Sequence, residues 1–188
     1  MLEKPNIFTK FTDCLSAHDG QILRPKASAQ LDFEGELAVV IGKPGRAIPA
    51  TEALNHVAGY TCFCDGSVRD FIKVSLITGK NFPATSPLGP WMVTADEIPD
   101  PAKLTLSTRL NGVRMQHSGT DMMMHDVPAL IAYCSAFTSL APGDIIATGT
   151  PEGIGARRNP AVWMKAGDVL EVEISRIGTL RARVVDEQ

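Results

Sequence analysis

Three acidic residues, Asp32, Glu34 and Glu36, are spaced two residues apart in the stretch L-D-F-E-G-E-L-A-V-V-I-G. Successive side chains on a β-strand point to opposite faces, so these three share one face if Leu31 to Ile41 is extended. Carboxylates this close repel one another unless one is protonated or a cation neutralises them. Hard divalent ions prefer oxygen ligands, so the spacing indicates a metal site. The alternative is an exposed acidic edge strand, and the strand alone does not decide between the two.

Asp65 could complete such a site. It follows the apolar run G-Y-T-C-F-C and opens D-G-S-V-R-D, so it lies at the end of a predicted strand. A loop there could present its carboxylate to Glu34 and Glu36 as a third oxygen ligand. The competing interpretation makes Asp65 a turn residue, because Asp-Gly is common in turns.

Two basic residues and a glycine-rich segment could act beside these acids. Arg69 and Lys80 could bind an anionic substrate group or stabilise an oxyanion, although most basic side chains are only solvated. The segment G-D-I-I-A-T-G-T-P-E-G-I-G, residues 143–155, could bring backbone N–H groups close to a ligand. It matches neither the phosphate loop nor the dinucleotide pattern, which disfavours nucleotide binding.

Length and composition predict one domain, residues 1–188, with 44% apolar residues. A net charge of −3 without a basic stripe argues against a nucleic-acid partner. No apolar run is long enough for a membrane span, and we expect no membrane association. The four cysteines form no C-x-x-C pair, which predicts reduced thiols and a cytoplasmic protein.

The chain is predicted to be mainly β (α+β), because glycines and prolines are scattered throughout and separate short apolar runs. One long helix is predicted from about Asp126 to Leu140, and a shorter one at Thr51 to Val57 with Thr51 as its cap. Asn111-Gly112 predicts a type I′ hairpin turn. The predicted strands are Glu36 to Gly42, Gly59 to Cys64, Gly89 to Thr94, Leu104 to Leu110, Ile145 to Thr148, Val169 to Ile174 and Thr179 to Val185.

Several motifs occur together and in order: L-D-F-E-G-E-L-A-V-V-I-G-K, A-G-Y-T-C-F-C-D-G-S-V-R-D, G-K-N-F, P-L-G-P-W-M-V-T, L-N-G-V-R-M-Q and L-A-P-G-D-I-I-A-T-G-T-P-E-G-I-G. In this combination the chain resembles the C-terminal catalytic domain of the fumarylacetoacetate hydrolase (FAH) family. The resemblance implies a mixed β-roll or barrel-like fold and a homodimer. It also implies Mg²⁺, or Mn²⁺ or Ca²⁺, held by Glu34, Glu36 and Asp65, with Asp32 a neighbour and not a ligand.

The resemblance further implies an enzyme acting on a 2-oxo or 1,3-dioxo acid. Acylpyruvate-type C–C bond hydrolysis is the first expectation, and decarboxylation, isomerisation or hydration of 2-oxo dioates is the alternative. Positions matching Arg69, Lys80 and Thr150 line the family's substrate site. Lys80 would stabilise developing negative charge, while Arg69 and the backbone near Gly149 and Thr150 would orient the substrate.

Two features depart from the family pattern. The segment G-x-N-Y-x-x-H-x-x-E, whose His-Glu pair activates water on a lid, does not occur in the 188 residues. Ile72 stands where the family often has Gln. These departures motivate a third expectation, a metal-binding dimer that keeps the scaffold without turnover.

Overall fold

The computed structural model describes residues 4–188, which form two five-stranded sheets and a two-stranded one. The first sheet has the order β1 (Leu15–Ala17), β7 (Ser86–Thr94), β5 (Val57–Cys64), β4 (Gly35–Ile41) and β10 (Ile145–Ala147). The second has the order β2 (Gln21–Arg24), β12 (Gly178–Asp186), β11 (Val169–Ile174), β8 (Thr105–Leu110) and β9 (Val113–Gly119). Strand β3 (Leu31–Asp32) pairs with β6 (Ser67–Val68). Neighbours are antiparallel except in the pairs β1–β7 and β2–β12.

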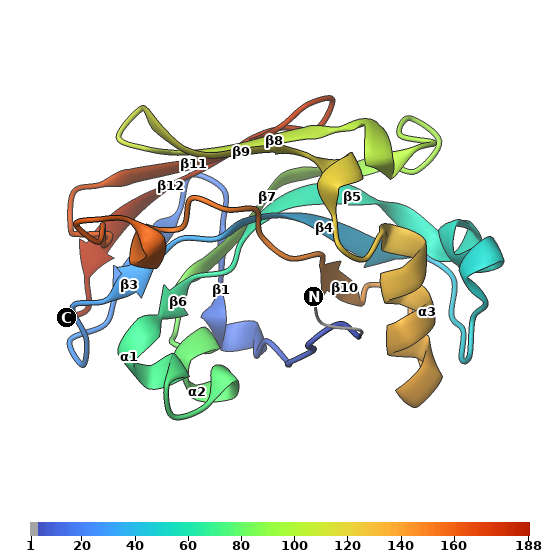
Figure 1. Ribbon diagram of the computed structural model, residues 1–188, viewed down its shortest axis with the longest axis horizontal. Helices are drawn as coiled ribbons and strands as arrows, with labels where there is room; N and C mark the ends of the chain where they lie inside the picture. The colour runs from blue at the N-terminus through green and yellow to red at the C-terminus, as the bar shows by residue number, and fades with distance from the viewer. Residues whose placement is uncertain (1–3) are drawn as a thin grey trace.

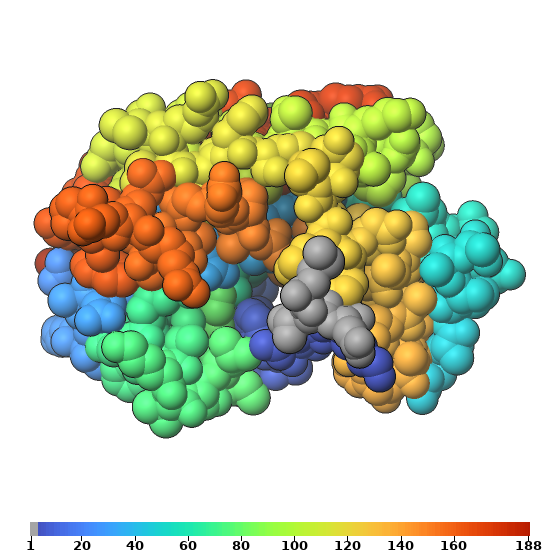
Figure 2. Space-filling view, in the orientation of Figure 1, coloured from blue at the N-terminus to red at the C-terminus, as the bar shows by residue number. Residues whose placement is uncertain are grey.

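Helices are few and mostly short. The α-helices are α1 (Arg69–Ile72), α2 (Leu76–Lys80) and α3 (Val127–Phe137). The 3₁₀ helices are η1 (Thr12–Cys14), η2 (Ala50–His56), η3 (Pro101–Lys103), η4 (Thr120–Met122) and η5 (Gly155–Arg157). The second sheet covers one face of the first, and α1, α2 and α3 lie on the opposite side (Figure 1). The loop coloured orange, which contains η5, lies directly above α1 and α2 in the space-filling view (Figure 2). The chain is therefore a strand-rich α+β fold with curled sheets, as expected.

The main core lies between the two large sheets. On β11 the side chains of Leu170, Val172 and Ile174 are buried and alternate with half-buried glutamates, as in a strand with one covered face. Strand β4 is buried at almost every position because it has β5 and β10 as neighbours and other elements on both faces. The alternative of an exposed acidic edge strand is therefore wrong.

All seven predicted strands are present with small shifts at their ends. The prediction of one extended segment over residues 31–41 is wrong in detail. Residues 31–32 pair with β6, whereas the strand that begins at Gly35 pairs with β5. The chain changes its hydrogen-bonding partner between them, so Phe33 and Glu34 lie outside both strands.

The helix and turn predictions have mixed outcomes. The long helix is shorter than predicted, because Thr138 is already extended. The predicted helix near Thr51 is the 3₁₀ helix η2, and its cap is Pro49 without a side-chain hydrogen bond, so Thr51 is not the cap. Asn111 and Gly112 have φ values of 53° and 77°, both positive as a type I′ turn requires.

The four cysteines are free and buried. Within residues 4–188, no helix combines the length and the apolar character that crossing a membrane requires.

Candidate metal centre

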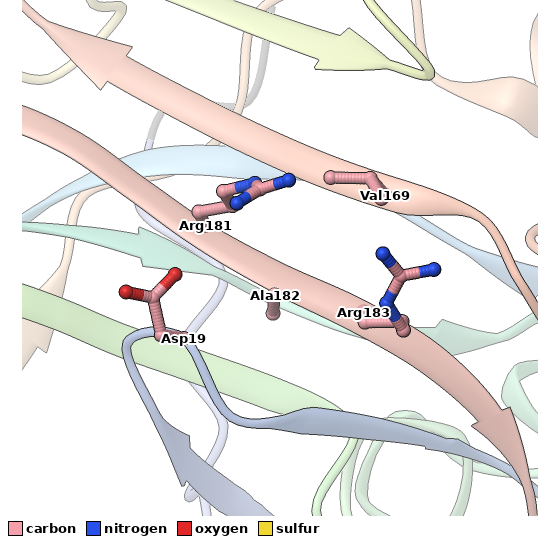
Figure 3. A pocket seen from close by; sticks show the side chains of 5 residues that line it. All are labelled: Asp19, Val169, Arg181, Ala182 and Arg183. Carbon is pink, nitrogen blue, oxygen red and sulfur yellow. The ribbon is translucent and has the colours of Figure 1, made fainter.

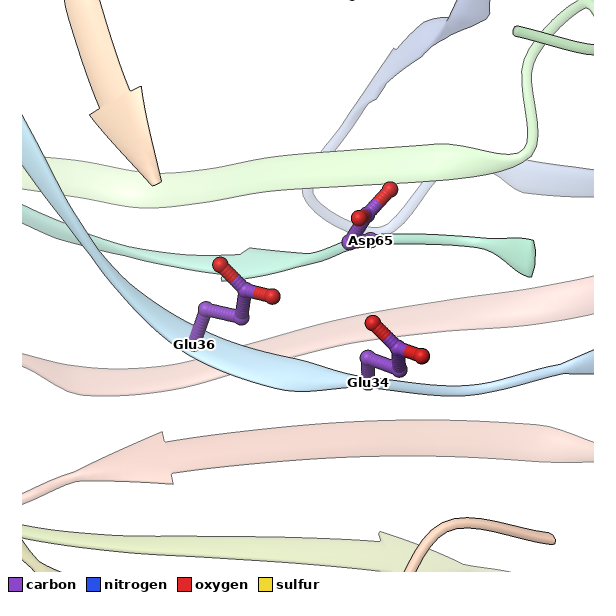
Figure 4. Close-up of side chains that lie close together, drawn as sticks. All are labelled: Glu34, Glu36 and Asp65. Atoms are coloured by element: carbon purple, nitrogen blue, oxygen red, sulfur yellow. The ribbon is translucent and has the colours of Figure 1, made fainter. Parts of the chain in front are cut away.

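Three carboxylates on or next to the neighbouring strands β4 and β5 converge on one point. One oxygen each from Glu34, Glu36 and Asp65 can be chosen so that all three lie within 4.8 Å of one another. The residues are 7%, 4% and 2% exposed, respectively. Glu36 lies on β4, Glu34 just before it and Asp65 just after β5, and the three side chains lie close together (Figure 4). The predicted set is thus brought together, away from bulk solvent.

Strand pairing explains this convergence. Gly35 is opposite Cys64 in the ladder, and the Asp65 N–H donates to the Glu34 carbonyl oxygen at 2.8 Å. Gly35 is needed because a Cβ there would lie 2.1 Å from Thr108 Oγ1 on β8. A side chain would push β4 away from the second sheet and move both flanking glutamates. Asp65 also leads into the turn toward β6, so its two interpretations are compatible.

Arg69 and Lys80 both point into the carboxylate cluster. The Lys80 ammonium donates to Glu34 Oε2 at 2.7 Å and to Asp65 Oδ2 at 2.6 Å. The Arg69 guanidinium contacts Glu34 and donates from Nε to Asp32 Oδ2 at 2.8 Å. Arg69 begins α1 and Lys80 ends α2, so this pair of short helices delivers both cations to the end of β5.

Asp32 is completely buried and belongs to the support of the cluster. It accepts hydrogen bonds from the backbone N–H groups of Gly155 at 2.7 Å and Ala156 at 2.9 Å, in addition to Arg69. It is not among the three converging carboxylates. Asp32 therefore ties Arg69 and the loop at η5 to β3.

The glycine-rich segment contacts the cluster through its backbone. Gly149, at a positive φ of 94°, donates its N–H to Glu36 Oε2 at 2.8 Å. The Thr150 hydroxyl donates to the Gly35 carbonyl at 2.9 Å and accepts from Gln116 Nε2 at 2.8 Å. Gln116 Oε1 in turn accepts from the Gly35 N–H at 3.0 Å. In this state Gly149 and Thr150 orient protein groups of the cluster.

Burial and neighbouring charge shift the ionisation of the cluster. Burial first, then the charges of Asp65 and Glu34, raise the pKa of Glu36 from 4.5 to about 8. Burial lowers the pKa of Lys80, but the carboxylates of Asp65 and Glu34 outweigh it, so the pKa is raised overall. The pKa of Arg69 is raised in the same way by Glu34 and Asp32 against its burial. Glu36 thus carries a proton near pH 7 when no further cation is present.

The donor chemistry fits a hard divalent cation. All three candidate ligands are carboxylates, the oxygen donors that Mg²⁺, Mn²⁺ and Ca²⁺ prefer. The ammonium of Lys80 already bridges two of them, which shows that the cluster stabilises positive charge at this point. Burial, followed by the charges of Asp65 and Glu34, raises the pKa of Glu36, and a further cation at the cluster would oppose that shift.

Sequence reasoning missed several residues of the site. Lys10 donates to Asp65 Oδ1 at 2.8 Å and to Ser86 Oγ at 2.9 Å. Gln116 supports the cluster as described above. None of these residues has a spacing relationship to the glutamates, because they come from other strands or from the segment before η1. Asp32, which also supports the cluster, was identified from the sequence by its two-residue spacing from Glu34.

A separate hollow lies on the second sheet, lined by Asp19, Val169, Arg181, Ala182 and Arg183 (Figure 3). Arg181 lies 4.0 Å from Glu171, and Arg183 donates to the Gly167 carbonyl at 3.4 Å. Both arginines are exposed on β12. The hollow contains no residue of the carboxylate cluster and is best explained as a solvated strand face.

Comparison with known proteins gives a consistent picture. The family model "Fumarylacetoacetate (FAA) hydrolase C-terminal" matches residues 1–185. The chain is 43% identical over 187 residues to the oxaloacetate tautomerase FAHD2B, mitochondrial, of Bos taurus, covering 97% of this chain and 60% of that protein. The chain thus spans about 60% of the length of this curated relative.

Two solved structures are similar in fold and sequence. The 2-hydroxyhepta-2,4-diene-1,7-dioate isomerase of Mycobacterium marinum has a TM-score of 0.91 and 38% identity, over 99% of this chain and 71% of that one. The maleylpyruvate hydrolase of Sphingobium sp. SYK-6, in complex with manganese(II) and pyruvate, has a TM-score of 0.88 and 33% identity, over 98% and 66%. All three relatives are named as enzymes, a tautomerase, an isomerase and a hydrolase. With its buried carboxylate cluster, its two curled sheets and a family match over nearly its whole length, this chain belongs to the fumarylacetoacetate hydrolase family.

Proposed function

We propose that the chain forms the catalytic domain of a divalent-metal-dependent enzyme acting on a 2-oxo or 1,3-dioxo acid. Glu34, Glu36 and Asp65 would hold Mg²⁺ or Mn²⁺. The observation that carries this proposal is the convergence of three buried carboxylates with two basic side chains fixed against them. The manganese and pyruvate in the related maleylpyruvate hydrolase support both the ion and the substrate class.

The residues around the cluster suit the chemistry of such acids. A divalent cation, when bound, polarises the keto group of a 2-oxo acid and favours its enolate form. Lys80 holds a fixed positive charge at the same carboxylates and would stabilise charge developing on a substrate oxygen. Arg69, held by Asp32, would orient a substrate carboxylate. Gly149 and Thr150, which donate to Glu36 and to the Gly35 carbonyl, would shape the site beside Glu36.

The first reaction to test is tautomerisation of oxaloacetate. In this reaction a proton moves between C3 and the keto oxygen, and no bond between carbon atoms breaks. The 43% identity to an oxaloacetate tautomerase favours it. Acylpyruvate-type C–C hydrolysis is the second candidate, favoured by the related maleylpyruvate hydrolase. In both reactions the bound cation would polarise the 2-keto group of the substrate.

The test is a substrate panel with Mg²⁺ or Mn²⁺. Oxaloacetate tautomerisation and acetylpyruvate hydrolysis are both followed by ultraviolet absorbance, with Glu36→Gln as the inactive variant. Glu52→Gln, an exposed glutamate on η2, is the matched control. Turnover that is lost in Glu36→Gln and kept in Glu52→Gln supports the proposal. Bound metal without turnover on any substrate would instead favour a scaffold that binds metal without catalysis.

We also propose a homodimer, following the family resemblance, and a reducing compartment. Sedimentation equilibrium at several protein concentrations tests the dimer. The reducing compartment is supported by four cysteines that are buried and free. A cytoplasmic location and the mitochondrial location in the names of relatives both meet that condition.

A further inference from the structure

Lys10 enters the carboxylate cluster from outside the sheets. Its ammonium donates to Asp65 Oδ1 at 2.8 Å, to Ser86 Oγ at 2.9 Å and to the Lys80 carbonyl oxygen. Its side chain is 16% exposed, more than those of Asp65 and Lys80. All three donors of the ammonium are therefore used, and part of the side chain remains open to solvent.

The segment that carries Lys10 is attached to the end of α2. Asn81 donates from Nδ2 to the Thr9 carbonyl at 2.9 Å and accepts from the Phe11 N–H. The ring of Phe8 lies 5.3 Å from the Lys80 ammonium, a cation–π distance. These contacts fix the residues that precede and follow Lys10 in the sequence. Its position beside Asp65 is therefore built into the fold.

A lysine in this position opposes metal binding, because its charge repels a divalent cation at Asp65. Two of its three acceptors, Ser86 Oγ and the Lys80 carbonyl, are neutral and take no part in the candidate metal set. They would keep the ammonium in place when a cation occupies Asp65. The third N–H group would then be left for another acceptor beside the cation, and its positive charge favours an anion.

We propose that Lys10 is a second ammonium group of the substrate site, beside Lys80, and that it binds an anionic oxygen of the oxo acid. This inference rests on the proposed function, since it needs a metal at Asp65 and an acid bound to it. It predicts effects of opposite sign when the charge of Lys10 is removed. The metal binds more tightly, and the anion binds more weakly.

The experiment measures two affinities without turnover. Mn²⁺ binding is followed by electron paramagnetic resonance, and oxalate, a chelating mimic of a 2-oxo acid, is titrated calorimetrically at saturating Mn²⁺. The variants are Lys10→Met, Lys10→Arg and the control Lys4→Met, which removes an exposed lysine of the same segment. For Lys10→Met we expect Mn²⁺ to bind about threefold more tightly or better, and oxalate about tenfold more weakly or worse. Lys10→Arg keeps the charge and should retain most of the oxalate affinity.

Four outcomes are distinguishable. The opposite shifts in Lys10→Met, with Lys4→Met unchanged, support the inference. Parallel losses of Mn²⁺ and oxalate affinity overturn it, because they show that Lys10 only orients Asp65 or maintains the fold. Unchanged oxalate affinity in Lys10→Met also overturns it. Absence of Mn²⁺ binding in the wild-type protein defeats the proposed function itself, and the inference with it.

Discussion

Replacing Glu36 by Gln separates the stability of the metal-free protein from its ability to bind metal. Glutamine keeps an acceptor for the Gly149 N–H, which donates to Glu36 at 2.8 Å, and it removes one of the three converging ionisable carboxyl groups. The raised pKa of Glu36 means that the folded metal-free protein holds a proton that the unfolded chain has lost between pH 4.5 and about 8. Its stability therefore falls as pH rises through this window. Glu36→Gln has no carboxyl group to titrate at this position, so it does not lose stability in this way and should be more stable than the wild type above pH 8.

The size of the effect follows from the pKa. The difference between 4.5 and about 8 corresponds to at most about 5 kcal/mol. We expect about 2 to 4 kcal/mol, since Glu34, Asp65 and Lys80 take up part of the change in charge. For a chain of 188 residues this corresponds to a rise in Tm of roughly 4 to 16 °C.

The assay is thermal unfolding between pH 5 and 9, in EDTA and in excess Mg²⁺. In EDTA the Tm of Glu36→Gln should exceed that of wild type at pH 8.5, and the two should approach each other at pH 5. Mg²⁺ should raise the Tm of the wild type and have little effect on the variant. Glu52→Gln should follow the wild type throughout. A variant that unfolds at or below the wild-type temperature in EDTA at pH 8.5 would refute the electrostatic reasoning.

Three further predictions follow from the same contacts. Lys80→Met should lower kcat with little change in KM, because the ammonium stabilises negative charge that develops on the substrate during the reaction. A raised KM with unchanged kcat in steady-state kinetics would contradict this. Asp32→Ala should lower the free energy of unfolding by about 3 to 5 kcal/mol in denaturant titrations, because it leaves the Arg69 Nε and the backbone N–H groups of Phe33, Gly155 and Ala156 without their acceptor. Gly35→Ala should cost about 1 to 3 kcal/mol because its Cβ would lie 2.1 Å from Thr108 Oγ1, and Thr108→Ala added to it should recover part of that loss in the same titration.

The secondary structure was largely readable from the chain. Strand β11 shows why, since Leu170 to Ile174 alternates between buried apolar and half-buried acidic residues. The short helices α1 and α2 were not predicted, because four or five residues carry too little periodicity. The capping role given to Thr51 failed because η2 begins one residue earlier, after Pro49.

The candidate site was predictable where its residues are close in sequence or lie at a strand end. Glu34 and Glu36 were paired by their spacing, and Asp65 by its place after β5. Lys10, Ser86 and Gln116 could not be found in this way. They reach the cluster from three different elements, and only the packing of those elements makes them neighbours.

The amino-acid sequence by itself determined the strand-rich class, the positions of the main strands and the acids that could hold a cation. It did so because alternation and two-residue spacing are local properties of an extended chain. Only the tertiary structure decided that the acids are buried, that Asp32 supports the site without joining it, and that Lys10 lies beside Asp65. These depend on which strands pair and which segments cover them, and hence on contacts between residues far apart in the chain.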